Sequence, residues 1–234
     1  MEIICAPLTC GLRAHAAARS VSSANCPSGD MATPSPRCRS ARIPRYALLI
    51  MDMINTFDFQ GGVPLARSAI GAARNIHKLR RAFASAELPV VFCNDNFGQW
   101  RSDFRAVYQR CAKSGSRGAE IAELLAPAPD DYFILKPKHS AFYLTPLDLL
   151  VRSLNVSTLV ITGIAGDSCV LATLSDAHIR DFEAIVVSDA IASQRPTSNR
   201  RVLAHVKEAK WAKVNSTRSV ASALVSRKAH VGGA

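Results

Sequence analysis

Short, almost unbroken runs of apolar residues recur along the chain from residue 46 onward. The first, YALLIMDM, covers Tyr46–Met53, and it lacks the alternation of apolar and polar positions that marks a strand with one face in water. Continuous apolar runs of this length are typical of strands that are covered on both faces in a parallel sheet. Four further runs have the same character: Pro89–Asn94, Tyr132–Leu135, Thr158–Thr162 and Glu183–Ala190.

Segments with helical spacing separate these runs. Ala66–Ala84 has an apolar stripe on one side and basic residues on the other, and Thr145 followed by Pro146 is typical of a helix start. Strands alternating with helices predict an α/β fold: a doubly wound, mostly parallel sheet of about six strands with helices on both faces. The elements expected near the end of the chain are helices over Arg200–Ala212 and Arg218–Ser226 and a short strand at Val214–Ser216.

The two ends of the chain lack this alternation. Ala, Ser, Pro and Arg dominate residues 1–43 without a sustained hydrophobic period, which predicts a disordered or non-native N-terminal extension. An organelle transit peptide shares this composition, and Met31 is an alternative start, so these interpretations stay open. We expect one α/β domain over 44–228 and a C-terminal tail over 229–234.

The net charge of +11 sits mostly outside the predicted sheet. Residues 1–45 carry six Arg against two acidic residues, residues 195–234 carry nine Lys or Arg against Glu208, and residues 46–194 carry 14 basic and 15 acidic residues. A basic groove with interleaved aromatic residues is absent, so nucleic acid is not expected as a partner. No apolar run approaches the length of a membrane span, so a membrane is not expected either.

The cysteines and histidines indicate neither a disulfide framework nor a metal site. Seven cysteines at irregular spacings, without a C-x-x-C pair, favour reduced thiols and a cytoplasmic location. The six histidines show no H-x-x-x-H spacing, so no zinc site is indicated. We therefore expect no metal and no other cofactor.

The segment TGIAGDSCVLATLSDA, Thr162–Ala177, combines the end of a strand, a glycine-rich turn and the start of a helix. Such a turn directs backbone N–H groups at whatever lies above it. Cys169 lies in the first helical turn, where N–H groups and the helix dipole stabilise a thiolate. A lone cysteine is more often a small buried apolar residue, but this location favours a nucleophile.

Polar residues also end two other predicted strands. Asp52 follows the first strand and Lys136 the third, and ligands of doubly wound folds bind outside the carboxyl ends of the strands. Taken singly, Asp52 is explained as a cap and Lys136 as a solvated strand end. Both together with Cys169, at equivalent ends of one sheet, predict a site in which the buried charges are paired.

Three segments resemble the signature regions of the isochorismatase-like cysteine hydrolases, in the same order: ALLIMDMINTF, ILKPKHSAF and TGIAGDSCVLATLSDA. The resemblance covers roughly residues 45–225 and implies a catalytic triad of Asp52, Lys136 and Cys169. It also implies a cis peptide bond between Ile164 and Ala165, with the backbone N–H groups of Ala165 and Cys169 forming an oxyanion hole.

The implied reaction is hydrolysis of a C–N bond in a small amide or ureido compound. Asp52 would take the proton of the Cys169 thiol and Lys136 would hold the charges in place, so that the sulfur forms a thioester. The same carboxylate would then activate the water that releases the product. A catalytically silent binding protein on the same scaffold is the alternative. As partners we expect the small-molecule substrate and further copies of the chain, which form a homo-oligomer.

The chain departs from the family pattern at two places. Gly166 stands where many members have Thr, which removes a hydroxyl and loosens the turn. The segment NDNFGQW, Asn94–Trp100, offers Asp95 but none of the histidines with which nicotinamidases hold a metal, so a metal-dependent nicotinamidase is disfavoured.

The sequence suggests several residues around the triad. His139 is interpreted as structural or as part of the pocket rim, because Asp52 already serves as the base. Arg101 and Asp103 are interpreted as a loop ion pair; the alternative is that Arg101 recognises a carboxylate of the substrate. The aromatic residues near the motifs either line the substrate pocket or belong to the core or an interface; the candidates for the pocket are Phe57, Phe97, Trp100, Phe142 and Tyr143.

Overall fold

The computed structural model describes residues 45–231, so the interpretation of 1–43 lies outside the described residues. Within them, six strands form one sheet in the order β3-β2-β1-β4-β5-β6, and every neighbouring pair is parallel. The predicted doubly wound α/β fold is confirmed. The strands are β1 (Tyr46–Met51), β2 (Val90–Asp95), β3 (Tyr132–Lys136), β4 (Thr158–Ile164), β5 (Glu183–Ala192) and β6 (Lys213–Asn215).

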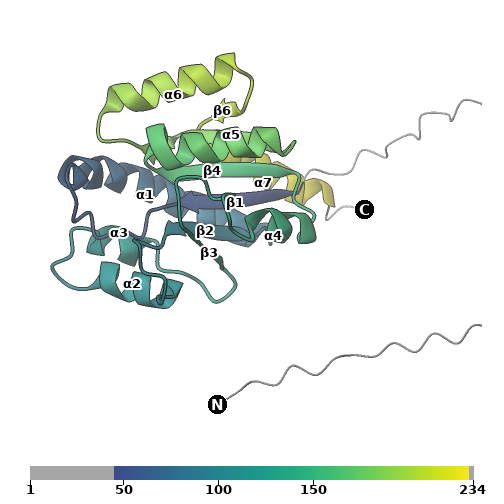
Figure 1. Ribbon diagram of the computed structural model, residues 1–234. Helices are drawn as coiled ribbons and strands as arrows, with labels where there is room; N and C mark the ends of the chain where they lie inside the picture. Colours follow the sequence, from purple (N-terminus) through teal and green to yellow (C-terminus); the bar gives the residue numbers. More distant parts are fainter. Residues whose placement is uncertain (1–44, 232–234) are drawn as a thin grey trace, which may run out of the picture. The chain divides into compact units, whose positions relative to one another are not determined.

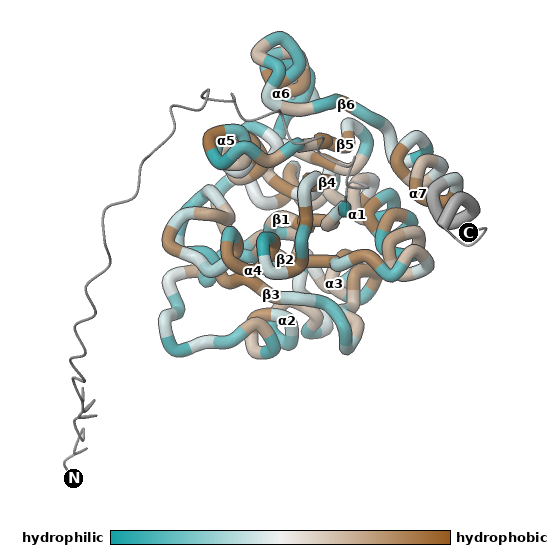
Figure 2. Tube along the Cα trace, turned by 90° about the vertical axis from the view of Figure 1, so that its right-hand side faces the viewer, coloured by the Kyte–Doolittle hydropathy of each residue, from teal (hydrophilic) through white to brown (hydrophobic). Residues whose placement is uncertain are grey.

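Helices cover both faces of the sheet (Figure 1). One face packs against α1 (Gly62–Ser85), α2 (Phe104–Ala112), α3 (Ala119–Leu124) and α7 (Thr217–Val231). The other packs against α4 (Leu147–Ser153), α5 (Leu171–Ile179) and α6 (Pro196–Glu208). Figure 2 views these layers from the edge, with α4 and α5 on one side of the strands and α1 and α7 on the other.

The central strands are apolar throughout because each successive side chain enters one of two cores. In β1, Leu48 and Ile50 belong to the core under α1, whereas Leu49 and Met51 belong to the core under α4 and α5. All four are fully buried, and the strands form the brown centre of the tube in Figure 2. The unbroken apolar run at the start of the domain follows from this double coverage.

Two regions differ from the sequence prediction. The short helices α2 and α3 fill the connection between β2 and β3, for which the sequence predicted no helix. At the other end, α7 continues to Val231, three residues into the segment predicted as a tail. No helix among residues 45–231 combines the length and apolar character that crossing a membrane requires.

The strand order places a switch point between β1 and β4. From β1 the chain builds outward through β2 to β3, then returns beside β1 with β4 and builds outward the other way. The helices that follow β1 and β4 therefore lie on opposite faces, and the carboxyl ends of these two strands flank a crevice. Asp52 directly follows β1, and Cys169 lies in the turn after β4.

Candidate active site

Asp52 leaves β1 with a left-handed backbone, φ 51°, a conformation that aspartate tolerates better than most residues. Its side chain is buried, and its Oδ1 accepts a hydrogen bond of 2.7 Å from the backbone N–H of Asp95. Burial raises the pKa of the Asp52 carboxyl, and the positive charge of Lys136 partly opposes that increase. Asp52 is thus a desolvated carboxylate held beside a cation.

Lys136 ends β3, and its side chain is fully buried. The ammonium Nζ lies 2.9 Å from Asp52 Oδ2, donates to the Lys138 carbonyl at 3.1 Å and lies 3.4 Å from Cys169 Sγ. Burial lowers the pKa of Lys136, but the negative charges of Asp52 and Cys169 outweigh it and the net shift is upward. Lys136 therefore remains a cation at neutral pH, whereas the side chain of Lys138 is exposed.

Cys169 lies in a short π-helical turn, Gly166–Val170, between β4 and α5. The peptide bond between Ile164 and Ala165 is cis, as the resemblance implies. Burial, together with the charge of Asp52, raises the pKa of the Cys169 thiol to about 12, although Lys136 opposes this. Burial thus favours the protonated thiol, because its effect on the pKa of Cys169 exceeds that of the nearby cation.

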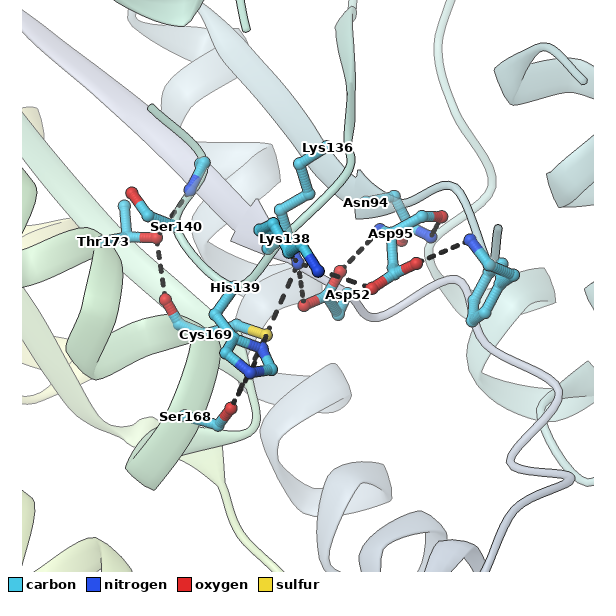
Figure 3. Close-up of polar contacts among 12 residues, drawn as sticks. Asp52, Asn94, Asp95, Lys136, Lys138, His139, Ser140, Ser168, Cys169 and Thr173 are labelled. Carbon is cyan, nitrogen blue, oxygen red and sulfur yellow. Dashed lines mark hydrogen bonds and ion pairs between the residues drawn. The ribbon is translucent and has the colours of Figure 1, made fainter. Parts of the chain in front are cut away.

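The three side chains meet at the carboxyl ends of β1, β3 and β4, as Figure 3 shows. Asp52 and Cys169 line a cleft with a volume of about 670 Å³, whose wall also includes Ala165 and Ser168. Lys136 lies behind them, buried from solvent. The arrangement joins a thiol, a buried carboxylate and a fixed positive charge.

Comparison with known proteins assigns the family. The model of the isochorismatase domain matches residues 46–219. The chain belongs to the isochorismatase family. Family relatives include the uncharacterized isochorismatase family protein YaaI of Bacillus subtilis, which is 37% identical over 174 residues, covering 74% of this chain and 95% of that protein.

Two further isochorismatase-family relatives have a described activity in their names. The ureidoacrylate amidohydrolase RutB of Methylorubrum extorquens is 34% identical over 171 residues, which cover 61% of this chain and 68% of that protein. The crystal structure of N-carbamoylsarcosine amidase from Thermoplasma acidophilum superposes with a TM-score of 0.56 at 27% identity, covering 74% of this chain and 96% of that one.

The aromatic residues expected in the pocket of this isochorismatase-family chain are distributed differently. Phe97 lines the cleft. Phe57 is fully buried in the core under α1, and Phe142 is buried against Phe182, with ring centroids 5.8 Å apart. Trp100 is 79% exposed and does not line the cleft; Tyr143, 49% exposed, does not line it either.

Phe59 lines the cleft in place of Phe57. The Asn55 side chain accepts the backbone N–H of Phe57 at 2.7 Å, and Phe57 has a left-handed backbone with φ 56°. This turn directs Phe57 into the core and leaves Phe59 half-exposed beside it, with ring centroids 6.5 Å apart. Only the Asn55 turn distinguishes the two residues, and its effect on side-chain direction was not apparent from the sequence.

Arg195 is a second lining residue that the sequence analysis missed. It precedes α6 as the N-cap residue and is exposed. Among the described residues that line the cleft it is the only lysine or arginine. Arg101, which had been considered for carboxylate recognition, does not line the cleft.

The turn at Gly166 is braced rather than loosened. A Cβ at Gly166 would lie 2.3 Å from Asn199 Oδ1, so the amide of Asn199 occupies the space that a side chain would need. Ser193 donates to that Oδ1 at 2.6 Å and accepts the backbone N–H of Asp167 at 3.2 Å. The hydroxyl of Ser193, directly after β5, thus holds the turn, whereas many family members have a threonine hydroxyl at position 166.

Proposed function

We propose that the chain is a cysteine hydrolase that cleaves a C–N bond in a small amide or ureido compound. The observation that carries this proposal is the contact of Asp52, Lys136 and Cys169, with the sulfur open to a cleft. Its family membership supports the assignment, since relatives are named as amidohydrolases of ureidoacrylate and N-carbamoylsarcosine. A volume of about 670 Å³ falls in the range of small-molecule sites.

The charges of the cluster fit acyl transfer. Because the Cys169 thiol is protonated at rest, attack on the substrate carbonyl requires transfer of its proton to Asp52 as the C–S bond forms. Burial and the nearby cation have opposite effects on Asp52, whose raised pKa makes it a stronger base than an exposed aspartate. Asp52 then protonates the departing amine as the C–N bond breaks, and Lys136 remains charged throughout.

The negative charge that develops on the substrate oxygen needs donors beside the sulfur. We assign this role to the backbone N–H groups of Ala165 and Cys169, two residues that line the cleft on the same turn. Donors of this kind contribute about 3 kcal/mol each to transition-state stabilisation. Release of ammonia from a panel of small primary amides and ureido acids tests the proposed activity. No release by the native protein from any of them would contradict it.

We expect Arg195 to select substrates that carry a carboxylate. It is the cation of the cleft wall, and no acidic side chain among residues 45–231 forms an ion pair with it. Arg195→Ala should raise KM for ureido acids about tenfold, because one exposed charge-assisted hydrogen bond to the substrate is lost. KM for neutral primary amides should stay unchanged. Steady-state kinetics on both substrate types measure this.

The matched control is Arg200→Ala, which removes the same charge from the exposed face of α6, outside the cleft. Equal KM changes for charged and neutral substrates in Arg195→Ala would show that Arg195 does not recognise a carboxylate.

Activity is expected to survive extensive chelation. The side chains at and directly after the end of β2 that offer oxygen ligands are engaged within the protein: Asn94 Oδ1 accepts from the N–H of Ile54, Asp95 Oδ1 from that of Phe97 and Asn96 Oδ1 from that of Gly98. Amide oxygens compete poorly with imidazole for transition metals. Assay after dialysis against EDTA, with metal analysis of the purified protein, checks this; loss of activity that one added metal restores would overturn it.

A further inference from the structure

The open side of the Cys169 sulfur faces an imidazole. His139 Nδ1 lies 3.8 Å from Cys169 Sγ and 3.5 Å from Ser168 Oγ, and the exposed His139 side chain lines the cleft (Figure 3). The interpretation of His139 as a rim or structural residue rested on Asp52 being sufficient as the base. Direct contact with the reacting sulfur gives His139 a different place in the chemistry.

The backbone around His139 is fixed to the backbone of the nucleophile. The N–H of Ala141, two residues further on, donates to Thr173 Oγ1 at 3.1 Å. The same hydroxyl donates to the carbonyl of Cys169 at 2.7 Å. One side chain of α5 therefore anchors both segments, and this shared anchor holds the imidazole beside the sulfur.

Asp52 also borders the cleft, but it is held among buried groups. It is 5% exposed, its Oδ1 accepts from Asp95 N–H and its Oδ2 faces Lys136 Nζ. Water that attacks a thioester on Cys169 enters through the cleft, where His139 is exposed. Asp52 lines the same cleft, but its two oxygens are already engaged by Asp95 N–H and Lys136 Nζ, so the exposed imidazole of His139 is the more accessible acceptor for the proton of that water.

We propose that His139 is a catalytic residue, the general base for thioester hydrolysis; this inference rests on the proposed function. The neutral imidazole takes a proton from water as the water oxygen bonds to the thioester carbon. When the C–S bond breaks, its electron pair stays on sulfur, and the imidazolium returns the proton to the Cys169 thiolate. The product leaves as a carboxylic acid, and the thiol and neutral imidazole are restored.

The test uses p-nitrophenyl acetate, which acetylates a cysteine nucleophile and releases a leaving group that needs no proton. In His139→Gln the rapid first release of p-nitrophenolate should equal that of the native protein. The later steady rate should fall about 100-fold, the contribution of a general base. Acid-quenched samples should then contain acetylated Cys169, detected by peptide mass spectrometry.

Two controls separate the base from a structural role. His178→Gln removes an imidazole from α5 that stacks on Trp211 outside the cleft, and it should behave as the native protein does. In His139→Ala, imidazole added to the buffer should restore the steady rate, because the exposed position leaves room for it.

The outcomes are distinguishable from failure of the proposed function. An unchanged steady rate in His139→Gln, or an equal slowing of both phases without acetylated Cys169, would overturn the role of His139 and leave the nucleophile intact. If Cys169→Ala releases p-nitrophenolate as fast as the native protein, the nucleophile itself is wrong and the role of His139 falls with it.

Discussion

Cys169→Ala should abolish turnover of amides and ureido acids, with a loss of about 10⁴-fold or more, and should leave the fold intact. The variant lacks the atom that forms the thioester, and no neighbouring side chain can replace it. Its sulfur is partly exposed to the cleft, so removing it leaves little empty space in the core. Ammonia release and thermal unfolding followed by circular dichroism measure the two parts of the prediction.

Cys111→Ala is the matched control. Cys111 is buried in α2, away from the cleft, and burial raises the pKa of its thiol to about 11. Its replacement should lower stability by about 1 kcal/mol and leave turnover unchanged. Activity in Cys169→Ala similar to that of the native protein would exclude the thioester mechanism.

Lys136→Met should both inactivate and destabilise the protein, with a loss of about 3–5 kcal/mol in the free energy of unfolding. The substitution leaves Asp52 buried without its cation. Burial already raises the pKa of Asp52, and removing Lys136 raises it further. Lys138→Met, an exposed neighbour of the same segment, is the control and should change stability by less than about 0.5 kcal/mol.

The loss in Lys136→Met should depend on pH in a defined direction. Below the ordinary aspartate pKa, about 3.9, Asp52 is protonated in both the folded and the unfolded chain, so its charge costs nothing. As the pH rises toward the raised pKa of the folded state, only the unfolded chain gains by ionising, and stability falls. Urea unfolding at acidic and at slightly alkaline pH should show the larger deficit at the alkaline value.

A double substitution tests the cause. Asp52→Asn combined with Lys136→Met removes the unpaired charge, so it should recover much of the stability and none of the activity. A loss below about 1 kcal/mol in Lys136→Met alone would contradict the pairing of the two charges.

The sheet was predictable because its strands are covered on both faces. Nothing in runs such as Tyr46–Met51 competes with the strand assignment, and parallel pairing then places Asp52 and Cys169 at one edge. The short helices α2 and α3 were not predicted, because α2 has only nine residues and α3 only six. Segments of that length contain too few turns to show a helical hydrophobic period. Helices and strands with a long, regular hydrophobic pattern can be predicted from a single sequence, whereas short helices cannot.

The sequence was sufficient to predict which strand ends carry the site residues, but not where their neighbouring side chains point. That Asp52 and Lys136 end their strands follows from the pattern, whereas the approach of His139 to the sulfur depends on a turn anchored through Thr173. The pKa of Cys169 depends on the fold in a similar way: the sequence indicates a helical turn, but not the burial that raises the pKa of the thiol. Turn geometry and desolvation are properties of the assembled fold.

The contact between Gly166 and Asn199 couples the side-chain sizes that two positions far apart in the sequence can accept. Because the Asn199 amide fills the volume beside Gly166, a side chain at 166 requires that amide to move or residue 199 to be smaller. A smaller residue at 199 would in turn leave Ser193 without the acceptor of its hydroxyl proton. Because residues 166, 193 and 199 share these contacts, the stability effects of substitutions at the three positions are expected to be non-additive.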